Sequence, residues 1–140
     1  MSEKQFELTV EARLENLAKI GSFIDETMRQ YHIEGVKTIY AVQLSVDEAC
    51  TNIIEHGYAA KAGKIMIRCV LLGDKLVVKI MDWGEYFDPT KIPTPDVESG
   101  VDERKVGGLG IYFMRENMDE VSYSRHDGMN LLTIAKYIKK

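Results

Sequence analysis

Cysteine is scarce in this sequence, and its scarcity argues against two common ways of stabilising a small protein. The chain has two cysteines, Cys50 and Cys69, and each lies in apolar surroundings without the spacing of metal ligands. We therefore expect neither a disulfide framework nor a structural metal site. Both residues are predicted to be buried free thiols in a reducing compartment.

An excess of basic residues and long apolar runs are also missing. The chain has 18 Lys and Arg residues against 22 Asp and Glu residues, a formal net charge of -4. This balance gives no support for direct contact with nucleic acid, which needs a basic patch. No run approaches the ~18 apolar residues of a membrane span, and residues 1–10 lack the pattern of a signal peptide. The composition thus predicts a cytoplasmic protein that does not cross a membrane.

Apolar residues recur with two periods along the chain, and these periods predict its elements. Alternation predicts strands over 4–10, 64–72, 75–82, 119–125 and 130–138, with turns at Gly73-Asp74 and Asp127-Gly128. Helical spacing predicts helices over 12–31, 36–55 and 107–118. This order indicates one α+β domain over residues 1–140, a two-layer sandwich with a mixed, mainly antiparallel sheet and helices on one face.

The second predicted helix contains the stretch DEACTNIIEHGY, residues 47–58, with polar side chains at a spacing of four. At ~100° per residue, Glu48 and Asn52 lie close together and border the apolar stripe of the helix. That position is typical of the rim of a pocket, but an ordinary boundary pair bonded to water would look the same. His56 continues the spacing, and we interpret it as capping or packing the helix end.

A second group of polar residues ends the strand over 75–82, in the stretch MDWGEYFDP. Counting by twos from Leu76 places Asp82 on the buried face, where an ionised carboxylate needs a fixed hydrogen-bond donor. The donor could be the exocyclic amine of a base, a backbone amide or a buried water. Gly84 removes a side chain where another group comes close. A strand that simply ends in a turn is the alternative interpretation.

A cluster of glycines follows the longest stretch without apolar periodicity. Residues 88–106 hold all three prolines and show no period, which is typical of a lid or a binding loop. The segment Gly107-Gly108-Leu109-Gly110 then opens the third helix. Backbone N–H groups that converge at a helix N-terminus favour phosphate. A helix start that needs close packing would explain the glycines about as well.

Together, these three motifs resemble those of the GHKL ATPase superfamily, which includes gyrase, Hsp90, histidine kinases and MutL. The shared features are Glu-x-x-x-Asn on a helix, Asp-x-Gly-x-x-Phe-Asp-Pro after a strand and Gly-Gly-Leu-Gly before a helix. Within the superfamily, DEACTNIIEHGY closely resembles the anti-sigma-factor serine/threonine kinases. The similarity runs from the first strand to Tyr137. It implies the Bergerat ATP-binding fold as a single HATPase-type domain.

The resemblance implies a role for each polar residue of the first two motifs. Glu48 would be the catalytic general base that activates an attacking hydroxyl. Asn52 would hold Mg²⁺ against the phosphates of ATP through its amide oxygen. Asp82 would accept the adenine amino hydrogen, and Gly84 would leave room for the base. ATP and Mg²⁺ are thus the expected cofactors.

The resemblance also assigns residues after the second motif. Residues 90–106 would form a lid over ATP, and Arg104 would pair with the terminal phosphate or the protein substrate, although a free surface Arg fits equally. The phosphates would be lined by Gly107, Gly108, Leu109 and Gly110. Thr133 is predicted to reach the adenine pocket. The sequence departs from the family there, because Gly128-Met129-Asn130 replaces the common Gly-Thr pairing.

The implied function is that of an ATP-dependent protein serine kinase which is also an anti-sigma factor. Such kinases phosphorylate an anti-anti-sigma protein of the STAS type, bind a sigma factor, regulate transcription and form homodimers. One alternative is a nucleotide-gated module that grips a partner without catalysis, or a regulator of a phosphatase pathway. Another is an α+β protein that binds no nucleotide.

Overall fold

The computed structural model describes residues 4–59, 61–91 and 108–138. Three helices and five strands carry the fold: β1 (Gln5–Glu11), α1 (Leu17–Gln30), α2 (Val36–Asn52), β2 (Lys64–Leu72), β3 (Lys75–Asp82), α3 (Gly108–Asn117), β4 (Glu120–His126) and β5 (Met129–Tyr137). Short helical turns lie at Leu14–Asn16 (η1), Ile53–Gly57 (η2) and Pro89–Lys91 (η3). None of the described helices is long and apolar enough to cross a bilayer.

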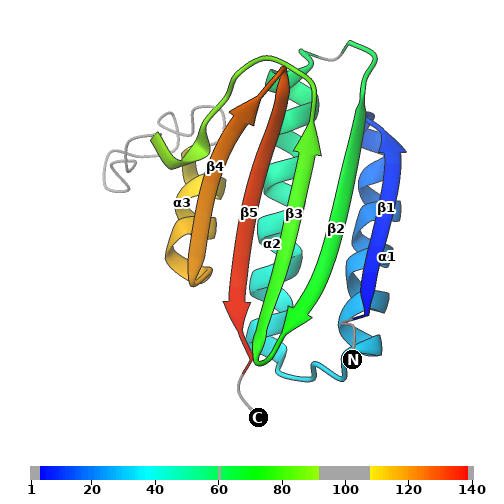
Figure 1. Ribbon diagram of the computed structural model, residues 1–140, viewed down its shortest axis with the longest axis vertical. Coiled ribbons are helices and arrows are strands. Elements are labelled where there is room, and N and C mark those ends of the chain that lie inside the picture. Colours follow the sequence, from blue (N-terminus) through cyan, green and yellow to red (C-terminus); the bar gives the residue numbers. More distant parts are fainter. Residues whose placement is uncertain (1–3, 60, 92–107, 139–140) are drawn as a thin grey trace.

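The strands form one five-stranded sheet in the order β1-β2-β3-β5-β4. The three helices lie on one face of this sheet, which confirms the predicted two-layer α+β sandwich (Figure 1). Every strand pairing among the described residues is antiparallel, so the sheet is not mixed as the element order suggested. The segment that follows β3 crosses above β5 and β4 on its way to η3 (Figure 1).

Two-residue turns set the register of the hairpins. Leu72 pairs with Lys75 across Gly73, whose φ of 63° suits a residue without Cβ. At the second hairpin, Asp127 and Gly128 both have positive φ, 51° and 81°, as a type I′ turn requires. These turns confirm the positions predicted from the sequence.

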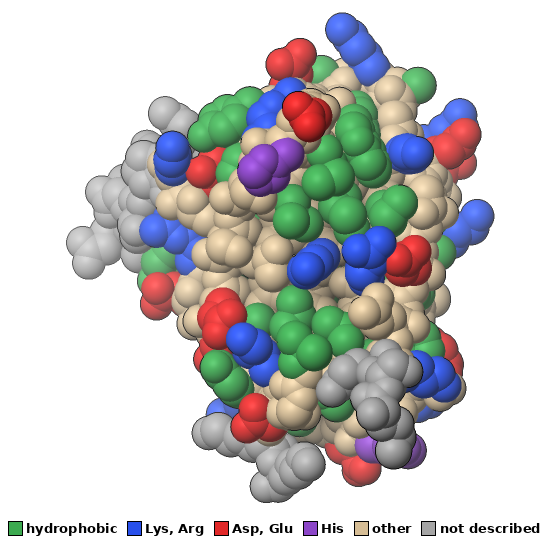
Figure 2. Space-filling model, viewed as in Figure 1, with side chains coloured by type: hydrophobic (Ala, Val, Ile, Leu, Met, Phe, Trp, Pro, Cys, Tyr) green, Lys and Arg blue, Asp and Glu red, His purple; other side chains and the backbone are tan. Residues whose placement is uncertain are grey.

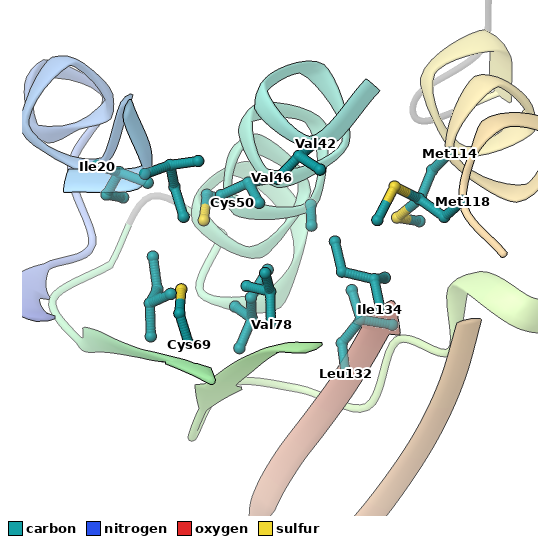
Figure 3. Packing of buried hydrophobic residues seen from close by; sticks show 14 of the residues in the cluster. Ile20, Val42, Val46, Cys50, Cys69, Val78, Met114, Met118, Leu132 and Ile134 are labelled. Atoms are coloured by element: carbon teal, nitrogen blue, oxygen red, sulfur yellow. The ribbon is translucent and has the colours of Figure 1, made fainter. Parts of the chain in front are cut away.

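The core fills the space between the helices and the inner face of the sheet. Branched and sulfur-containing side chains from α1, α2, α3 and the central strands meet there, including Ile20, Val46, Val78, Met114 and Ile134 (Figure 3). Cys50 and Cys69 are buried in the same cluster as free thiols, as predicted. Burial raises the pKa of both, that of Cys69 to about 12, so neither thiol ionises at neutral pH.

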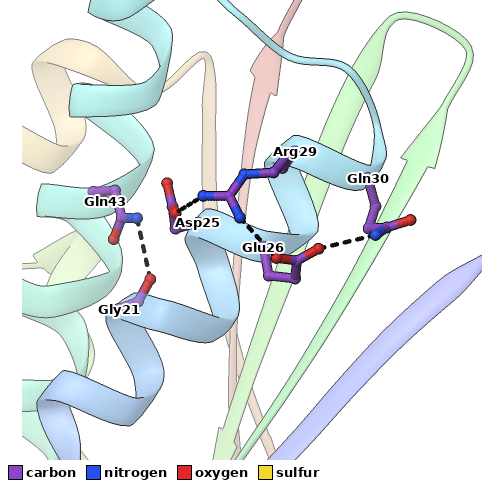
Figure 4. Close-up of polar contacts among 6 residues, drawn as sticks. All are labelled: Gly21, Asp25, Glu26, Arg29, Gln30 and Gln43. Carbon is purple, nitrogen blue, oxygen red and sulfur yellow. Dashed lines mark hydrogen bonds and ion pairs between the residues drawn. The ribbon is translucent and has the colours of Figure 1, made fainter.

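The first helical segment is shorter than its apolar period predicts. Residues 14–16 form the 3₁₀ turn η1, and α1 begins only at Leu17. Arg29 on its exposed side contacts Asp25 at 2.6 Å and Glu26 at 2.9 Å (Figure 4). The Nε2 of Gln43 donates to the Gly21 carbonyl at 3.2 Å and ties α2 to α1 (Figure 4). The two helices are therefore joined by this hydrogen bond as well as by the core.

The outer face of the sheet carries no helix within the described part of the chain. Even so, three of its apolar side chains are at most 7% exposed, namely Val77, Met81 and Ala135. Arg68 and Lys79 pair across the middle of this face. Figure 2 shows the face as two hydrophobic areas separated by a central group of basic side chains.

Candidate functional site

The helix that carries Glu48 and Asn52 changes its winding at its end. α2 is regular to Asn52 and continues as the π turn η2, where the apolar period predicts plain helix to residue 55. Single π turns in α-helices are frequent at functional sites. Asn52 is only 4% exposed, and its Nδ2 atom has no hydrogen-bond partner among the described residues. A buried unpaired amide costs about 1–3 kcal/mol, which makes it a candidate ligand-binding group.

A small pocket lies beside this amide, between the helices and the sheet. Asn52, Asp82 and Asn130 are its buried polar groups. The rest of its wall is mainly apolar and includes Phe87 and Met114. The pocket volume is about 20 Å³, room for about one water molecule. A purine base is larger, so binding one requires the apolar side chains to move.

Asp82 faces the buried side of β3, as the alternation predicts, and is 4% exposed. Its Oδ1 accepts hydrogen bonds from the Gly84 backbone N–H and from Asn130 Nδ2, both at 2.9 Å. Burial raises the pKa of Asp82, while the two hydrogen bonds and the positive charge of Arg125 partly offset the rise. The carboxylate thus has fixed donors on one oxygen.

Another group comes close to Gly84, as the sequence predicts for a glycine next to Asp82. A Cβ at this position would lie 2.5 Å from the carbonyl oxygen of Gly57. The same carbonyl accepts the Glu85 N–H at 2.7 Å. The glycine is therefore needed for the close approach of the π turn to the segment after β3. The implied role of Gly84 in leaving room for a base stays a prediction.

Glu48 contacts the first turn of α3. A Cβ on Gly110 would lie 1.8 Å from the Glu48 Cδ, so only a glycine allows this carboxyl group to sit there. Burial raises the pKa of Glu48, and the negative charges of Asp47 and Glu55 add to the rise. The Asn52 amide is near enough to lower the pKa partly, though its Nδ2 is not in hydrogen-bonding geometry. The structure thus brings together the first motif and the third.

Much of the predicted phosphate and lid region lies outside the described residues. This applies to residues 92–106, which include Arg104, and to Gly107. Gly108 and Leu109 form the start of α3 together with Gly110. Residues 90 and 91 of the predicted lid belong to η3. The role of these residues in holding phosphate stays a prediction.

The structure does not bring Thr133 to the pocket. Thr133 pairs with Lys79 and Ser122 on the sheet face that is turned away from the helices. The residue of β5 that lines the pocket is Asn130, which lies directly opposite Asp82 in the sheet register. Counting back by twos from buried Leu132 would have found it, because the strand period is two. The strand register therefore puts Thr133 on the wrong face of the sheet for the predicted role.

Two further residues near Asn130 also carry no motif signal. The Tyr123 hydroxyl and the Arg125 guanidinium both donate to the Asn130 Oδ1, the latter at 2.8 Å.

His56 packs near the end of its helix, as its position in the sequence predicts. Its ring centroid lies 6.2 Å from that of Phe87.

Comparison with known proteins identifies the family of this chain. Residues 10–136 match the family described as histidine kinase-like ATPase domain. The chain belongs to this family. Among curated proteins, the chain is similar to the serine-protein kinase RsbW of Bacillus cereus, with 32% identity over 103 residues. The RsbW of Staphylococcus aureus is 36% identical over 104 residues.

These matches confirm the resemblance to anti-sigma-factor kinases, although the chain spans only part of each relative. The aligned segment covers 71% of this chain and 64% of the Bacillus protein, and 70% and 65% for the Staphylococcus protein. The fold is similar to the crystal structure of the RsbU and RsbW domains of Rv1364c from Mycobacterium tuberculosis. The TM-score is 0.71 at 16% identity, over 98% of this chain and 33% of that one.

Membership in the histidine kinase-like ATPase family implies the use of ATP. Whether Mg²⁺ fits the site depends on the residues around Asn52. The described residues contain no group of three or more His, Cys, Asp and Glu side chains that could hold a metal. Mg²⁺ commonly takes only one or two protein oxygens and completes its shell with phosphates and water. One buried amide with an unpaired end fits such a site, since turning the amide presents its oxygen.

Proposed function

We propose that this chain is an ATP-dependent protein serine kinase. The observation that carries the proposal is the position of Glu48. Its half-buried carboxyl group lies against Gly110, and the buried Asn52 follows it by one turn on the same helix. A candidate base, a candidate metal ligand and the start of α3 therefore meet in one place. Similarity to the RsbW serine-protein kinases supports the same reaction.

In the proposed reaction, the hydroxyl oxygen of a protein serine attacks the terminal phosphorus of ATP. The bond from that phosphorus to the bridging oxygen breaks, ADP leaves, and the hydroxyl proton passes to Glu48. Asp82 would accept a hydrogen from the adenine amine. Asn52 would hold Mg²⁺, and the bound ion would neutralise part of the phosphate charge. Phosphoryl transfer needs little beyond this positioning.

The proposed protein substrate is a STAS-type anti-anti-sigma protein, and the proposed second partner is a sigma factor. Phosphorylation of the substrate would then control how much sigma factor this protein holds, and so transcription. We further propose a cytoplasmic homodimer. Light scattering across a range of protein concentrations tests the dimer, and a monomer at all concentrations would contradict that part alone.

Incubation with γ-labelled ATP and candidate STAS-domain proteins tests the kinase proposal directly. We expect label on a serine of the partner, with ADP formed in equal amount. Tight nucleotide binding without phosphoserine would instead support the nucleotide-gated binding module. Absence of ATP and ADP binding in calorimetry would contradict both functions.

Replacing Asn52 with Ala is expected to remove the Mg²⁺ dependence of ATP binding. The wild type should bind ATP more tightly with Mg²⁺ than with a chelator, because the ion links amide and phosphates. In the variant, calorimetry should give the same affinity under both conditions. Asn117→Ala is the matched control, since the Asn117 amide bonds the Phe113 carbonyl near the other end of α3. A Mg²⁺ effect that survives in Asn52→Ala would show that another residue holds the ion.

A further inference from the structure

The side-chain amide of Asn130 can take only one orientation. Its Nδ2 faces three acceptors, which are Asp82 Oδ1 at 2.9 Å, the Gly84 carbonyl at 3.2 Å and the Glu85 carbonyl at 3.1 Å. On the other side, its Oδ1 accepts from Arg125 Nη1 at 2.8 Å. A guanidinium can only donate, and a carbonyl or ionised carboxylate can only accept. Turning the amide would break every one of these contacts.

This fixed amide determines which atom of Asp82 remains for a ligand. Oδ1 already accepts from Asn130 Nδ2 and from the Gly84 N–H. Among the described residues, no donor is hydrogen-bonded to Oδ2. Since Asp82 lines the pocket, Oδ2 is the oxygen left to meet a bound group. An ionised carboxylate accepts only, so the bound group must offer a hydrogen-bond donor at that point, such as the N–H of an amine.

Arg125 does not line the pocket, yet it holds the amide from outside. Its Nη1 donates both to Asn130 Oδ1 and to the Gly84 carbonyl, the latter at 3.1 Å. Tyr123 also donates to Asn130, but a hydroxyl can accept as well as donate and so does not define the orientation. The Arg125 guanidinium is thus the group on this side that fixes the orientation of the Asn130 amide.

We propose that Asn130, held by Arg125, positions Asp82 and thereby makes the pocket select a base with an exocyclic amine over one with a carbonyl. The inference rests on the proposed nucleotide site and adds two residues that position its adenine-reading carboxylate. The amine of adenine donates to Oδ2, whereas the carbonyl of hypoxanthine or guanine at the same ring position presents an acceptor. Without Asn130, Oδ1 loses a donor and the carboxylate is free to turn. Asn130 and Arg125 are positioning residues, because neither is argued to touch the reacting atoms.

The test compares the dissociation constants of ATP and inosine triphosphate, which differ at the amine position. We expect wild type to prefer ATP, and Asn130→Ala to reduce that preference by about 10-fold to 100-fold, the usual range for one well-placed readout contact. Arg125→Met should reduce it in the same direction, and Arg125→Lys should restore most of it. The Arg125 variants alter an exposed side chain, so they test the inference even if Asn130→Ala fails to fold.

A merely structural role would weaken both nucleotides equally and leave their ratio unchanged, which would overturn the inference. Arg29→Met on α1 controls for the loss of one positive charge and should leave the ratio at the wild-type value. A wild type that binds both triphosphates equally would overturn the inference while the nucleotide site stands. A wild type that binds neither would remove the proposed function, and the inference with it.

Discussion

Replacing Glu48 with Gln is expected to reduce phosphoryl transfer by about 10²-fold to 10⁴-fold, the usual contribution of a general base. The amide keeps nearly the shape of the carboxyl group, so its contact with Gly110 is preserved. It cannot take the proton from the attacking serine hydroxyl. Binding of ATP with Mg²⁺ should survive, because the proposed adenine and metal contacts belong to Asp82 and Asn52. Glu48→Ala should likewise lose phosphoryl transfer and still bind ATP with Mg²⁺.

The measurement is single-turnover transfer of labelled phosphate to the partner, with ATP binding followed by calorimetry. Asp47→Asn is the matched control, since it removes one negative charge from the neighbouring, exposed position of the same helix. That variant should transfer phosphate within a few-fold of wild type. Transfer by Glu48→Gln at the wild-type rate would show that the base is another group.

The spacing of apolar residues in the sequence predicts much of where Glu48 and Asp82 lie in the fold. Successive residues of a strand point to opposite faces, so alternation alone places Asp82 inward among Val78 and Ile80. The same rule places Asn130 inward and Thr133 outward. The family resemblance suggested that Thr133 reaches the adenine pocket, whereas the strand period places its side chain on the opposite face of the sheet. A register that shifts by one residue exchanges the two faces, so periodicity outweighs motif similarity here.

Other features of the site depend on approaches between distant segments, which no local pattern encodes. Gly84 is needed because the Gly57 carbonyl lies against it, 27 residues earlier in the chain. The π turn that delivers this carbonyl has no sequence signal of its own. Likewise, the orientation of Asn130 follows from Arg125 and from two backbone carbonyls, all fixed only by folding.

Gly110→Ala is expected to be nearly as damaging to transfer as the loss of Glu48, with little cost to folding. The new Cβ would lie 1.8 Å from Glu48 Cδ and 2.2 Å from its Cγ, so the side chain must leave its place. A long side chain can rotate away cheaply, whereas a misplacement of ~1 Å in a catalytic group can cost 10²-fold in rate. The measurement is single-turnover transfer beside thermal unfolding.

Gly21→Ala supplies the matched control for a glycine replaced within a helix. Its Cβ would meet the Gln43 Oε1 at 3.8 Å, an ordinary contact. Alanine in place of glycine inside a helix stabilises by about 0.5–1 kcal/mol. We expect Gly21→Ala to raise the unfolding temperature and leave transfer unchanged. Gly110→Ala likewise replaces a glycine in a helix, and its thermal unfolding shows whether a fall in its rate comes from a weakened helix.

The double variant Glu48→Ala/Gly110→Ala decides whether the two residues act as one unit. If Gly110 matters only because it admits the Glu48 side chain, the double variant should transfer no more slowly than Glu48→Ala alone. Independent roles would instead multiply the two losses, as they would if Gly110 held phosphate through its backbone. An active Gly110→Ala single variant would contradict the role of Gly110 in admitting the Glu48 side chain, because a base displaced from the start of α3 would then still reach the serine hydroxyl.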